Sequence, residues 1–300
     1  GNGAPKRLQV WKQSSKNFHV TDVKRTTENK VVSLKATYLL AAGNLYVVTY
    51  RIYPSGIVNV SAQFTSTDMQ AAETEVSEAT RMATFTPGSD AARKAASKLE
   101  VPRIGVRFRL PAQMNNVQYF GRGPEENYID RNHGTLVGVY KTTADKMYFN
   151  YVRPQENGHH TDTRWIALSP DKGNGLAIVA DSLIVFNALR NSIEDFDSEE
   201  ALPHPYQWNN FSPEEVANHD EKAARNVLRR MHHVNDITPR DFVEVCVDMK
   251  QQGVGGYDSW GARPEPFHQI PANRDYSWGF TLVPVRSASQ ANEVAKYDYQ

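Results

Sequence analysis

The most constraining feature of the sequence is that segment after segment alternates apolar and polar side chains with a period of two. In 104–110, for example, Ile, Val, Phe and Leu alternate with Gly and Arg. Such alternation is typical of β-strands with one face in the core and one in solvent. We therefore predict strands at 31–40, 45–53, 57–65, 104–110, 117–120, 165–169, 176–180, 183–187, 241–250 and 277–283.

Strand follows strand without the helix alternation of a parallel sheet, so the predicted fold class is all-β. We expect an antiparallel sandwich of two large sheets with one short helix and long loops. The helix is expected from Ser212, where Ser-Pro-Glu-Glu supplies an N-cap, a first-turn proline and a glutamate three residues after the cap.

The predicted domain organisation is a single β-sandwich domain over 8–286, which suits a chain of 300 residues. Residues 1–7 are interpreted as a linker or the remnant of a cut in a longer chain. Loop insertions are expected at 69–98 and 195–207. For the first of these both short helices and a mobile loop stay open, and the polar tail 287–300 is expected to fray.

Charge and cysteine content exclude several classes of function. Lys and Arg number 34 and Asp and Glu also 34, so no net field attracts nucleic acid or anionic lipid. No apolar run approaches the roughly 20 residues of a membrane span. Cys246 is the single cysteine, which excludes an intramolecular disulfide or a cysteine-rich zinc site, and we expect it to be buried in a strand.

Three segments concentrate glycine, aromatic rings and polar groups beyond what a strand connection needs: 119–131, 151–165 and 252–261. Together they suggest a binding rim. In the first, ion pairs among Glu125, Asp130, Arg122 and Arg131 in front of a buried Tyr128 are the plainer interpretation. In the second, Asn157-Gly158 is a turn signal in its own right.

In the third segment, glycines flank Tyr257-Asp258-Ser259-Trp260 and allow an irregular backbone to present an indole outward. A flat apolar ring with an N–H at its edge suits the C–H face of a sugar. Packing of Trp260 in the core is the alternative.

Other chemistry finds little support in the sequence. His159-His160 and His232-His233 are adjacent pairs, which on a strand point to opposite faces and cannot easily bind one metal ion. No Gly-x-Ser-x-Gly elbow is present. Glycosidase chemistry needs two carboxylates about 5–10 Å apart, but no spacing selects a pair from Glu125, Glu126, Asp130, Glu156 and Asp258.

The three segments carry motifs that resemble the C-terminal, or small-chain, domain of the large bacterial β-galactosidases of glycoside hydrolase family 2. The motifs are Gly-Arg-Gly-Pro-x-Glu-Asn-Tyr-x-Asp-Arg at 121–131, Pro-x-Glu-Asn-Gly at 154–158 with Thr163-Arg164, and Gly-x-Gly-Gly-x-Asp-Ser-Trp at 253–260. Their order and spacing match over roughly 8–285.

The resemblance implies a β-supersandwich similar to galactose mutarotase, packed on the catalytic barrel of an oligomeric parent. The catalytic glutamates, and the Mg and Na that the family often uses, belong to that barrel, so no catalytic residue, metal ligand or cofactor is expected in this segment. By motif position Trp260 contacts the galactoside substrate, with Asp258 and Tyr257 beside it. The remaining rim candidates are Arg122, Glu126, Asn127, Glu156, Asn157 and His159.

Two departures from the family pattern matter. Tyr257 stands where the family usually has an acidic residue, which bears on substrate preference, and 195–207 looks longer than the usual connection. Two other functions stay open: an independent carbohydrate-binding module, and an aldose 1-epimerase using His159 or His160 with Glu156.

Overall fold

The structure of the chain is a computed structural model. It describes residues 8–14, 17–40, 44–66, 100–152, 154–196, 234, 237–256, 258, 261–297 and 299. The helix predicted at Ser212, the insertion 69–98 and all but the first two residues of 195–207 lie outside the described residues. The divisions predicted for the domain and its insertions therefore stay predictions.

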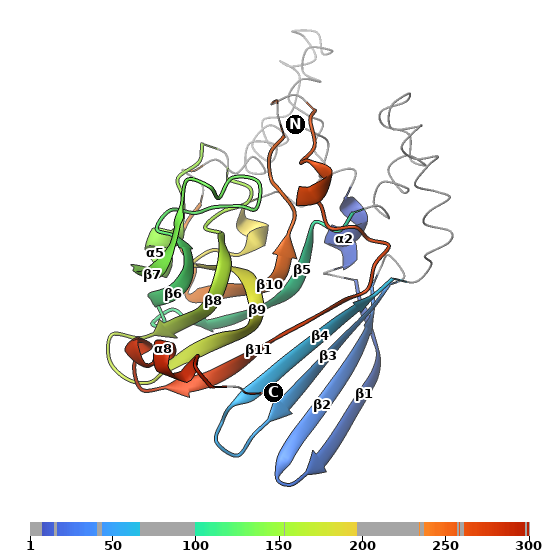
Figure 1. Ribbon diagram of the computed structural model, residues 1–300, viewed down its shortest axis with the longest axis vertical. Coiled ribbons are helices and arrows are strands. Elements are labelled where there is room, and N and C mark those ends of the chain that lie inside the picture. Colours follow the sequence, from blue (N-terminus) through green and yellow to red (C-terminus); the bar gives the residue numbers. More distant parts are fainter. Residues whose placement is uncertain are drawn as a thin grey trace, which may run out of the picture.

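The described residues form an antiparallel β-structure, which confirms the all-β fold class (Figure 1). One path of neighbouring strands runs β1-β2-β3-β4-β11-β9-β8-β6-β7, while β10 pairs with both β9 and β5. The strands are β1 (His19–Glu28), β2 (Val31–Leu39), β3 (Leu45–Ile52), β4 (Val58–Thr65), β5 (Arg103–Pro111), β6 (Asn116–Gly123), β7 (Leu136–Thr143), β8 (His160–Ser169), β9 (Gly175–Leu189), β10 (Phe242–Gln251) and β11 (Tyr276–Val285).

Helical segments are short in the part of the chain that the structure describes. They are the α-helices α2 (Gln9–Ser14), α5 (Ala144–Met147) and α8 (Ala291–Val294), with 3-10 turns η1 (Ile193–Asp195), η4 (Pro266–His268) and η5 (Ala288–Gln290). The side chain of Thr143 accepts a hydrogen bond from the Lys146 amide and so caps α5.

Strand β9 connects the part of the sheet that contains β11 with the pair formed by β10 and β5. Its first half pairs with β11 and its second half with β10, while β8 pairs with both halves. The sequence predicts two strands here, 176–180 and 183–187, but the backbone continues through the exposed residues 181–183 as one strand. Because residues 181–183 are exposed, the apolar pattern breaks there although the strand continues.

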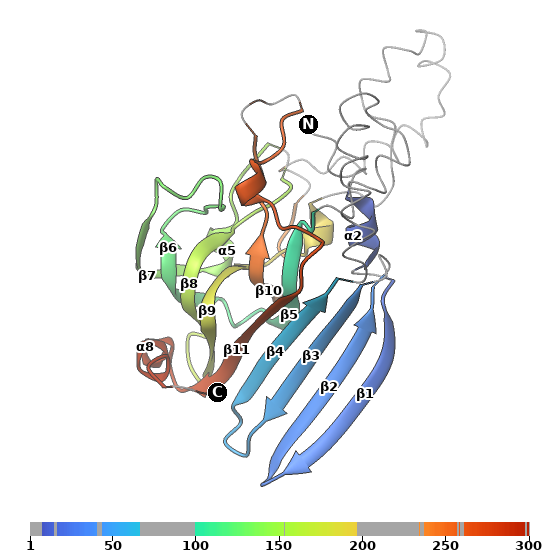
Figure 2. The same cartoon turned by 45° about the vertical axis from the view of Figure 1, so that its right-hand side comes forward.

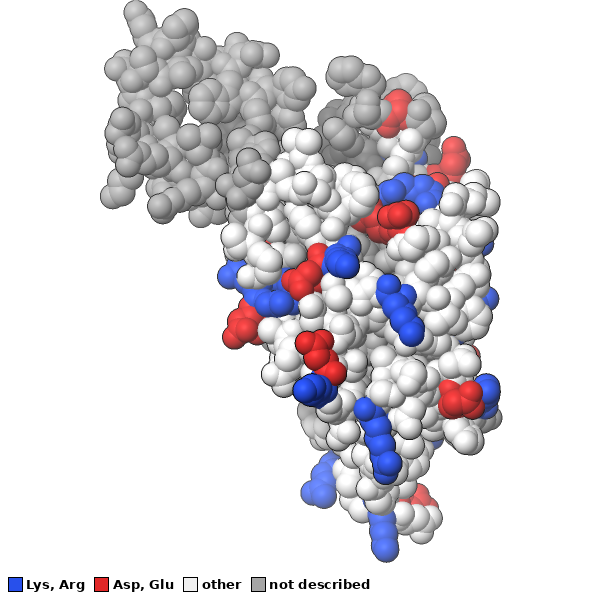
Figure 3. Space-filling view, turned by 90° about the vertical axis from the view of Figure 1, so that its left-hand side faces the viewer, with Lys and Arg blue, Asp and Glu red and all other residues white. Residues whose placement is uncertain are grey.

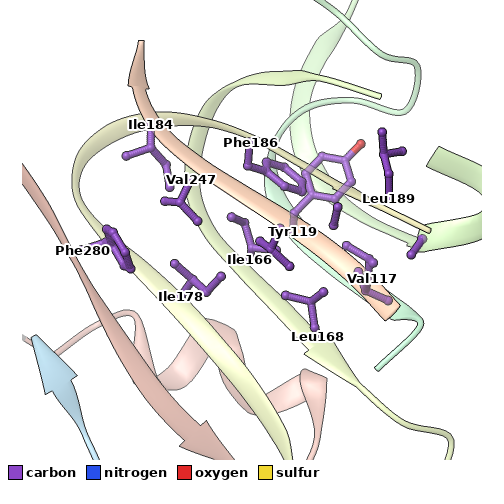
Figure 4. Close-up of a cluster of buried hydrophobic side chains, with 14 of the residues drawn as sticks. Val117, Tyr119, Ile166, Leu168, Ile178, Ile184, Phe186, Leu189, Val247 and Phe280 are labelled. Atoms are coloured by element: carbon purple, nitrogen blue, oxygen red, sulfur yellow. The ribbon is translucent and has the colours of Figure 1, made fainter. Parts of the chain in front are cut away.

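The main core is a cluster of buried side chains contributed by β3, β4, β6, β8, β9, β10 and β11 (Figure 4). Burial of each large aliphatic side chain there contributes about 1.5–3 kcal/mol to stability. Its buried members include Val117, Tyr119, Ile166, Leu168, Ile178, Ile184, Phe186, Leu189, Val247 and Phe280. Cys246, on the other face of β10, is 2% exposed, as predicted for a buried strand residue.

The polar face of the β5–β10 pair is an ion-pair layer. Arg107 and Arg109 on β5 both donate to Glu244 on β10, at 3.3 and 3.0 Å. Farther along, Arg103 is paired with Asp248 at 2.5 Å. Alternation at 104–110 predicted a solvated face, and the side chains of Arg107 and Arg109 are indeed 36% and 53% exposed. Their partners on β10 differ, because Glu244 and Asp248 are each 3% exposed.

The segment after Arg286 was expected to fray, and its described part instead packs on the sheet. Ala291, in α8, has no exposed surface and belongs to a cluster with Trp165 of β8 and Val283 of β11. Figure 1 shows α8 beside the ends of β8 and β9. Alanine side chains in this mostly polar segment are small enough to pack closely against the cluster.

Charges of both signs are interspersed over the described surface seen in Figure 3. This agrees with the zero net charge of the chain. Among the described residues, no helix has the length and apolar character needed to cross a bilayer.

Candidate functional site

The sheet itself brings two of the three predicted rim segments together. Residues 119–123 are the end of β6 and residues 160–165 the start of β8, and these strands are neighbours, with Phe120 opposite Trp165. The loops that extend from them, 124–135 and 148–159, therefore lie at the same end of the fold. We call these the first and second loops, and 252–262, which follows β10, the third loop.

Asp130 connects the first loop to the third. Its Oδ2 accepts a hydrogen bond of 2.8 Å from the Gly255 amide. A Cβ at Gly253 would lie 2.5 Å from the same oxygen, so glycine is required for this approach. The other carboxylate oxygen, Oδ1, is buried without a hydrogen-bond partner among the described residues. The aspartate thus fixes the start of the third loop.

The third loop is closed at its base. A Cβ at Gly256 would lie 2.4 Å from the Ala262 carbonyl oxygen, so the two ends of the loop touch there. The Asp258 carboxylate accepts hydrogen bonds from the Gly261 and Ala262 amides, each at 3.0 Å. Tyr257 and Trp260, the other two residues predicted to bind substrate, lie outside the described residues.

Glu126 joins the first loop to the second. One carboxylate oxygen accepts from Arg131, at 2.6 Å, and from the Tyr151 hydroxyl. The other accepts from the Gly158 amide at 2.8 Å and from the Tyr128 hydroxyl at 3.3 Å. With four donors around it, this buried carboxylate is committed to holding the loops together.

The ion pairs expected among Glu125, Asp130, Arg122 and Arg131 are not the ones observed, because both arginines pair with other carboxylates. Tyr128 is buried, as predicted. Arg131, however, pairs with Glu126 rather than with its other acidic neighbours, and it lies 4.5 Å from the Tyr128 ring centroid. Arg122 pairs at 2.5 Å with Asp162, a residue of β8 that the sequence did not suggest. Adjacency in the sheet decided the partner of Arg122.

Asn127 is fully buried, and its side-chain amide joins the first loop to β6 and β8. The amide nitrogen donates to the carbonyls of Arg122 and Glu125, at 3.1 and 3.0 Å. The amide oxygen accepts from the backbone amide and the hydroxyl of Thr161, at 2.9 and 2.6 Å. All hydrogen-bonding positions of the side chain are used within the protein.

Asn157 shapes the second loop in the same way. Its side chain accepts from the Phe149 amide and donates to the Phe149 carbonyl, both at 2.7 Å. Its own carbonyl accepts from Asn187 of β9 at 3.1 Å. Glu156, by contrast, keeps a side chain that is 46% exposed, 4.0 Å from Arg103.

The two histidines are buried and neutral. His159 Nδ1 donates to the Asn127 carbonyl at 3.1 Å and His160 Nδ1 to the Arg122 carbonyl at 3.0 Å, because a carbonyl can only accept. Burial lowers the pKa of His159 to about 3 and that of His160 to about 4. The His159 ring also stacks on Tyr128, at 5.0 Å between centroids. Neither imidazole carries a proton on Nε2 at neutral pH.

The carboxylates of Glu126, Asp130 and Asp258 each accept hydrogen bonds within the loops, whereas Glu125 and Glu156 are exposed. Sequence reasoning found most of these residues but missed Tyr151, Asp162 and the link from Asp130 to Gly255, since each is a contact between distant segments with no local signal. Within the described ranges, no group of three or more His, Cys, Asp or Glu side chains is placed to hold a metal ion.

Comparison with known proteins points in one direction. Residues 2–282 match the family model described as beta galactosidase small chain. The chain is 29% identical over 288 residues to a beta-galactosidase of Priestia megaterium, and 26% identical over 290 residues to one of Streptococcus thermophilus. Each alignment covers 95% of this chain and 22% of the relative.

A beta-galactosidase of Arthrobacter sp. is 40% identical over 124 residues, which cover 39% of this chain and 12% of that protein. The chain thus spans only about a fifth of the length of the first two relatives, 22% in each case. Because the family model covers nearly all of the sequence, from residue 2 to residue 282, the chain belongs to the beta-galactosidase small-chain family.

Proposed function

We propose that this chain is a non-catalytic part of a longer β-galactosidase and that its loop end forms one wall of the galactoside site. In this proposal Trp260 stacks on the sugar, with Asp258 and Tyr257 beside it. The glutamates that cleave the glycosidic bond, and any Mg or Na that assists them, are supplied by another domain of the same polypeptide.

The observation that carries the proposal is the junction of the three loops at one end of the sandwich. Asp130 fixes the third loop to the first, and Glu126 fixes the first to the second. A hydrogen-bonded frame of this kind positions a side chain on the third loop with little loss of conformational entropy on binding.

The state of the carboxylates supports a non-catalytic role. Retaining and inverting glycosidases need two carboxyl groups that face a common sugar. Here Glu126 accepts from four donors, Asp258 accepts from two backbone amides, and Asp130 accepts from Gly255. Groups committed in this way to the loops are poorly suited to deliver or take up a proton.

The loop end also exposes large apolar side chains, which supports a pocket completed by another domain. Val152 is 77% exposed and Phe267 71% exposed, and Val254 in the third loop is 38% exposed. Such side chains around a proposed half-site are typical of a surface that a partner covers.

The test is the Trp260→Ala variant in the longer polypeptide, with Trp260→Phe as the matched control. Loss of ring stacking is worth about 1 kcal/mol, or about a fivefold rise in KM, and a smaller ring should restore part of it. Tyr257→Glu, which inserts the acidic residue usual in the family, should change the preference among β-glycosides. Unchanged kinetics in all three variants would exclude the proposed wall.

Two other functions remain candidates and need their own measurements on the 300-residue chain. A self-sufficient carbohydrate-binding module should bind galactose or lactose with micromolar affinity, whereas half a pocket should bind at most in the millimolar range. An aldose 1-epimerase should accelerate the mutarotation of α-galactose in polarimetry. The neutral His159 and His160, both buried, favour neither acid nor base action in such a reaction near neutral pH.

A further inference from the structure

The strands β1, β2 and β3, which we call the wing, extend beyond the layer formed by β5 and β10. Figures 1 and 2 show them side by side, with β1 the outermost strand and farthest from β5 and β10. All ten residues of β1 are exposed. In the described structure, therefore, neither face of β1 is covered.

The two faces of the wing differ in character. Strand register places His19, Asp22, Lys24, Thr26 and Glu28 of β1 on one face, next to Ser33, Lys35 and Thr37 of β2. On β1 that face is polar, as expected for a sheet surface in water, whereas on β2 and β3 it also carries Val31, Leu39, Leu45 and Val47. The other face, which we call the apolar wing face, carries Val20 opposite Tyr38, Val23 opposite Ala36, Leu34 opposite Tyr50 and Val32 opposite Ile52.

The apolar wing face continues the core outward beyond its covering layer. Val48 of β3 lies in the core and is 2% exposed, whereas Val23, two strands away in the same register row, is 56% exposed. Val20 is 52% and Ile52 40% exposed. Phe18, 44% exposed, extends the same face because its ring meets Tyr38 edge-on at 5.3 Å.

A single exposed valine on an edge strand is ordinary, but a connected series of apolar side chains across three strands is not. Arg25 is the only charged residue that register places on this face of the wing among the described residues. A nucleic acid or an acidic peptide would find little to bind here. The matching surface must itself be mainly apolar, as in permanent interfaces that resemble a divided core.

We infer that the apolar wing face docks against another domain of the same longer polypeptide. The inference assumes, with the proposed function, that the chain works within such a polypeptide, and the relatives, of which it covers 22%, have that length. Residues upstream of β1 also reach the fold on this side. Leu8 and Trp11 of the N-terminal segment pack with Phe64, which follows Tyr46 and Tyr38 in one register row of the apolar face.

A second copy of the chain is a less suitable occupant. Edge-to-edge pairing of two copies through β1 is opposed, because that edge is interrupted by an irregularity between Val20 and Asp22 and carries Lys24 and Arg25. Irregularities and basic residues are the usual devices that prevent edge-to-edge pairing. Face-to-face packing of two copies is tested by the sedimentation experiment below.

The test compares Val23→Glu, on the apolar wing face, with Thr26→Glu, on the polar face of the same strand. Both positions are exposed, so in the 300-residue chain alone the two variants should unfold at the same temperature as the parent sequence. In the longer polypeptide we expect Val23→Glu to lower the unfolding temperature by several degrees in calorimetry, because a buried unpaired carboxylate opposes docking. Thr26→Glu should leave it unchanged.

Equal effects of the two variants in the longer polypeptide would overturn the inference. So would a dimer of the 300-residue chain in sedimentation that Val23→Glu dissociates, since the occupant would then be a second copy. Neither measurement involves a galactoside. A normal KM in Trp260→Ala together with a selective effect of Val23→Glu would reject the proposed function and leave the docking surface standing.

Discussion

Replacement of Asn127 by alanine tests most sharply whether the loop end is a hydrogen-bonded frame. The variant removes an amide that has no exposed surface. It deprives two groups of the buried Thr161, its backbone amide and its hydroxyl, of the oxygen to which both donate. The Arg122 carbonyl keeps its hydrogen bond from His160, so it should contribute less to the loss.

The expected magnitude follows from this count. A buried group left without its partner costs about 1–3 kcal/mol, so two such groups predict that Asn127→Ala lowers the free energy of unfolding by about 2–6 kcal/mol. Asn127→Asp has nearly the same shape but points a carboxylate oxygen at two carbonyl oxygens about 3 Å away, at 3.1 and 3.0 Å. At pH 7 it should destabilise at least as much as alanine, and less at low pH, where the carboxyl gains a proton to donate.

The assay is urea unfolding of the 300-residue chain followed by circular dichroism, with the exposed Asn150→Ala as control. An unchanged m-value would show that the same surface unfolds in each variant. A loss below about 0.5 kcal/mol for Asn127→Ala, the range of ordinary surface substitutions, would refute the reasoning. An aspartate variant more stable than the alanine variant at pH 7 would refute it equally.

Three further predictions concern single ionisable groups. Glu126→Gln should lower the free energy of unfolding by about 3 kcal/mol in urea unfolding. This is near the lower end for a broken buried ion pair, because the Arg131 partner is half exposed. No loss of stability would contradict the four-donor geometry. Burial raises the pKa of Glu194, but hydrogen bonds from Arg107 and Ser192 outweigh it and hold that pKa at about 2. This lowered pKa stabilises the fold at pH values above 4.5, the ordinary pKa of the group, and the stabilisation is lost as pH falls toward 2. Glu194→Gln should therefore cost about 1 kcal/mol of stability at pH 7, allowing for solvent screening, and nothing near pH 2. His159 and His160 should stay neutral, with the proton on Nδ1, at pH 6 in nitrogen-correlated NMR. Because their pKa values in the folded state lie below the ordinary 6.5, the stability of the fold should fall as pH drops from 6.5 toward 4. Titration of either imidazole near pH 6.5 would show that it is not buried.

Most of the sheet was predictable because side-chain alternation reports burial on one face. Prediction from alternation failed where a strand has no buried face to contrast with its exposed one. Strand β1 is exposed along its whole length and β7 over much of it, and neither was predicted from the sequence. Residues 121–123 suggested a loop because of their glycines, yet they continue β6, where Gly121 and Gly123 lie close against neighbouring side chains.

At the candidate site, sequence patterns located the loops but not the roles of their side chains. Asn127 and Asn157 have the residue types of a polar rim, and tertiary contacts turn both inward to satisfy backbone groups. The pairing of Arg122 with Asp162 depends on β6 lying next to β8, and the bond from Asp130 to Gly255 joins residues 125 positions apart. No local pattern encodes contacts of that kind.

The central claim is that this chain holds one side of a sugar site whose reactive groups belong to another domain. Isothermal titration of the longer polypeptide with a non-hydrolysed galactoside inhibitor tests it directly. Trp260→Ala should raise the dissociation constant about fivefold, which corresponds to about 1 kcal/mol of lost stacking. An unchanged dissociation constant would place the indole outside the site and contradict the account.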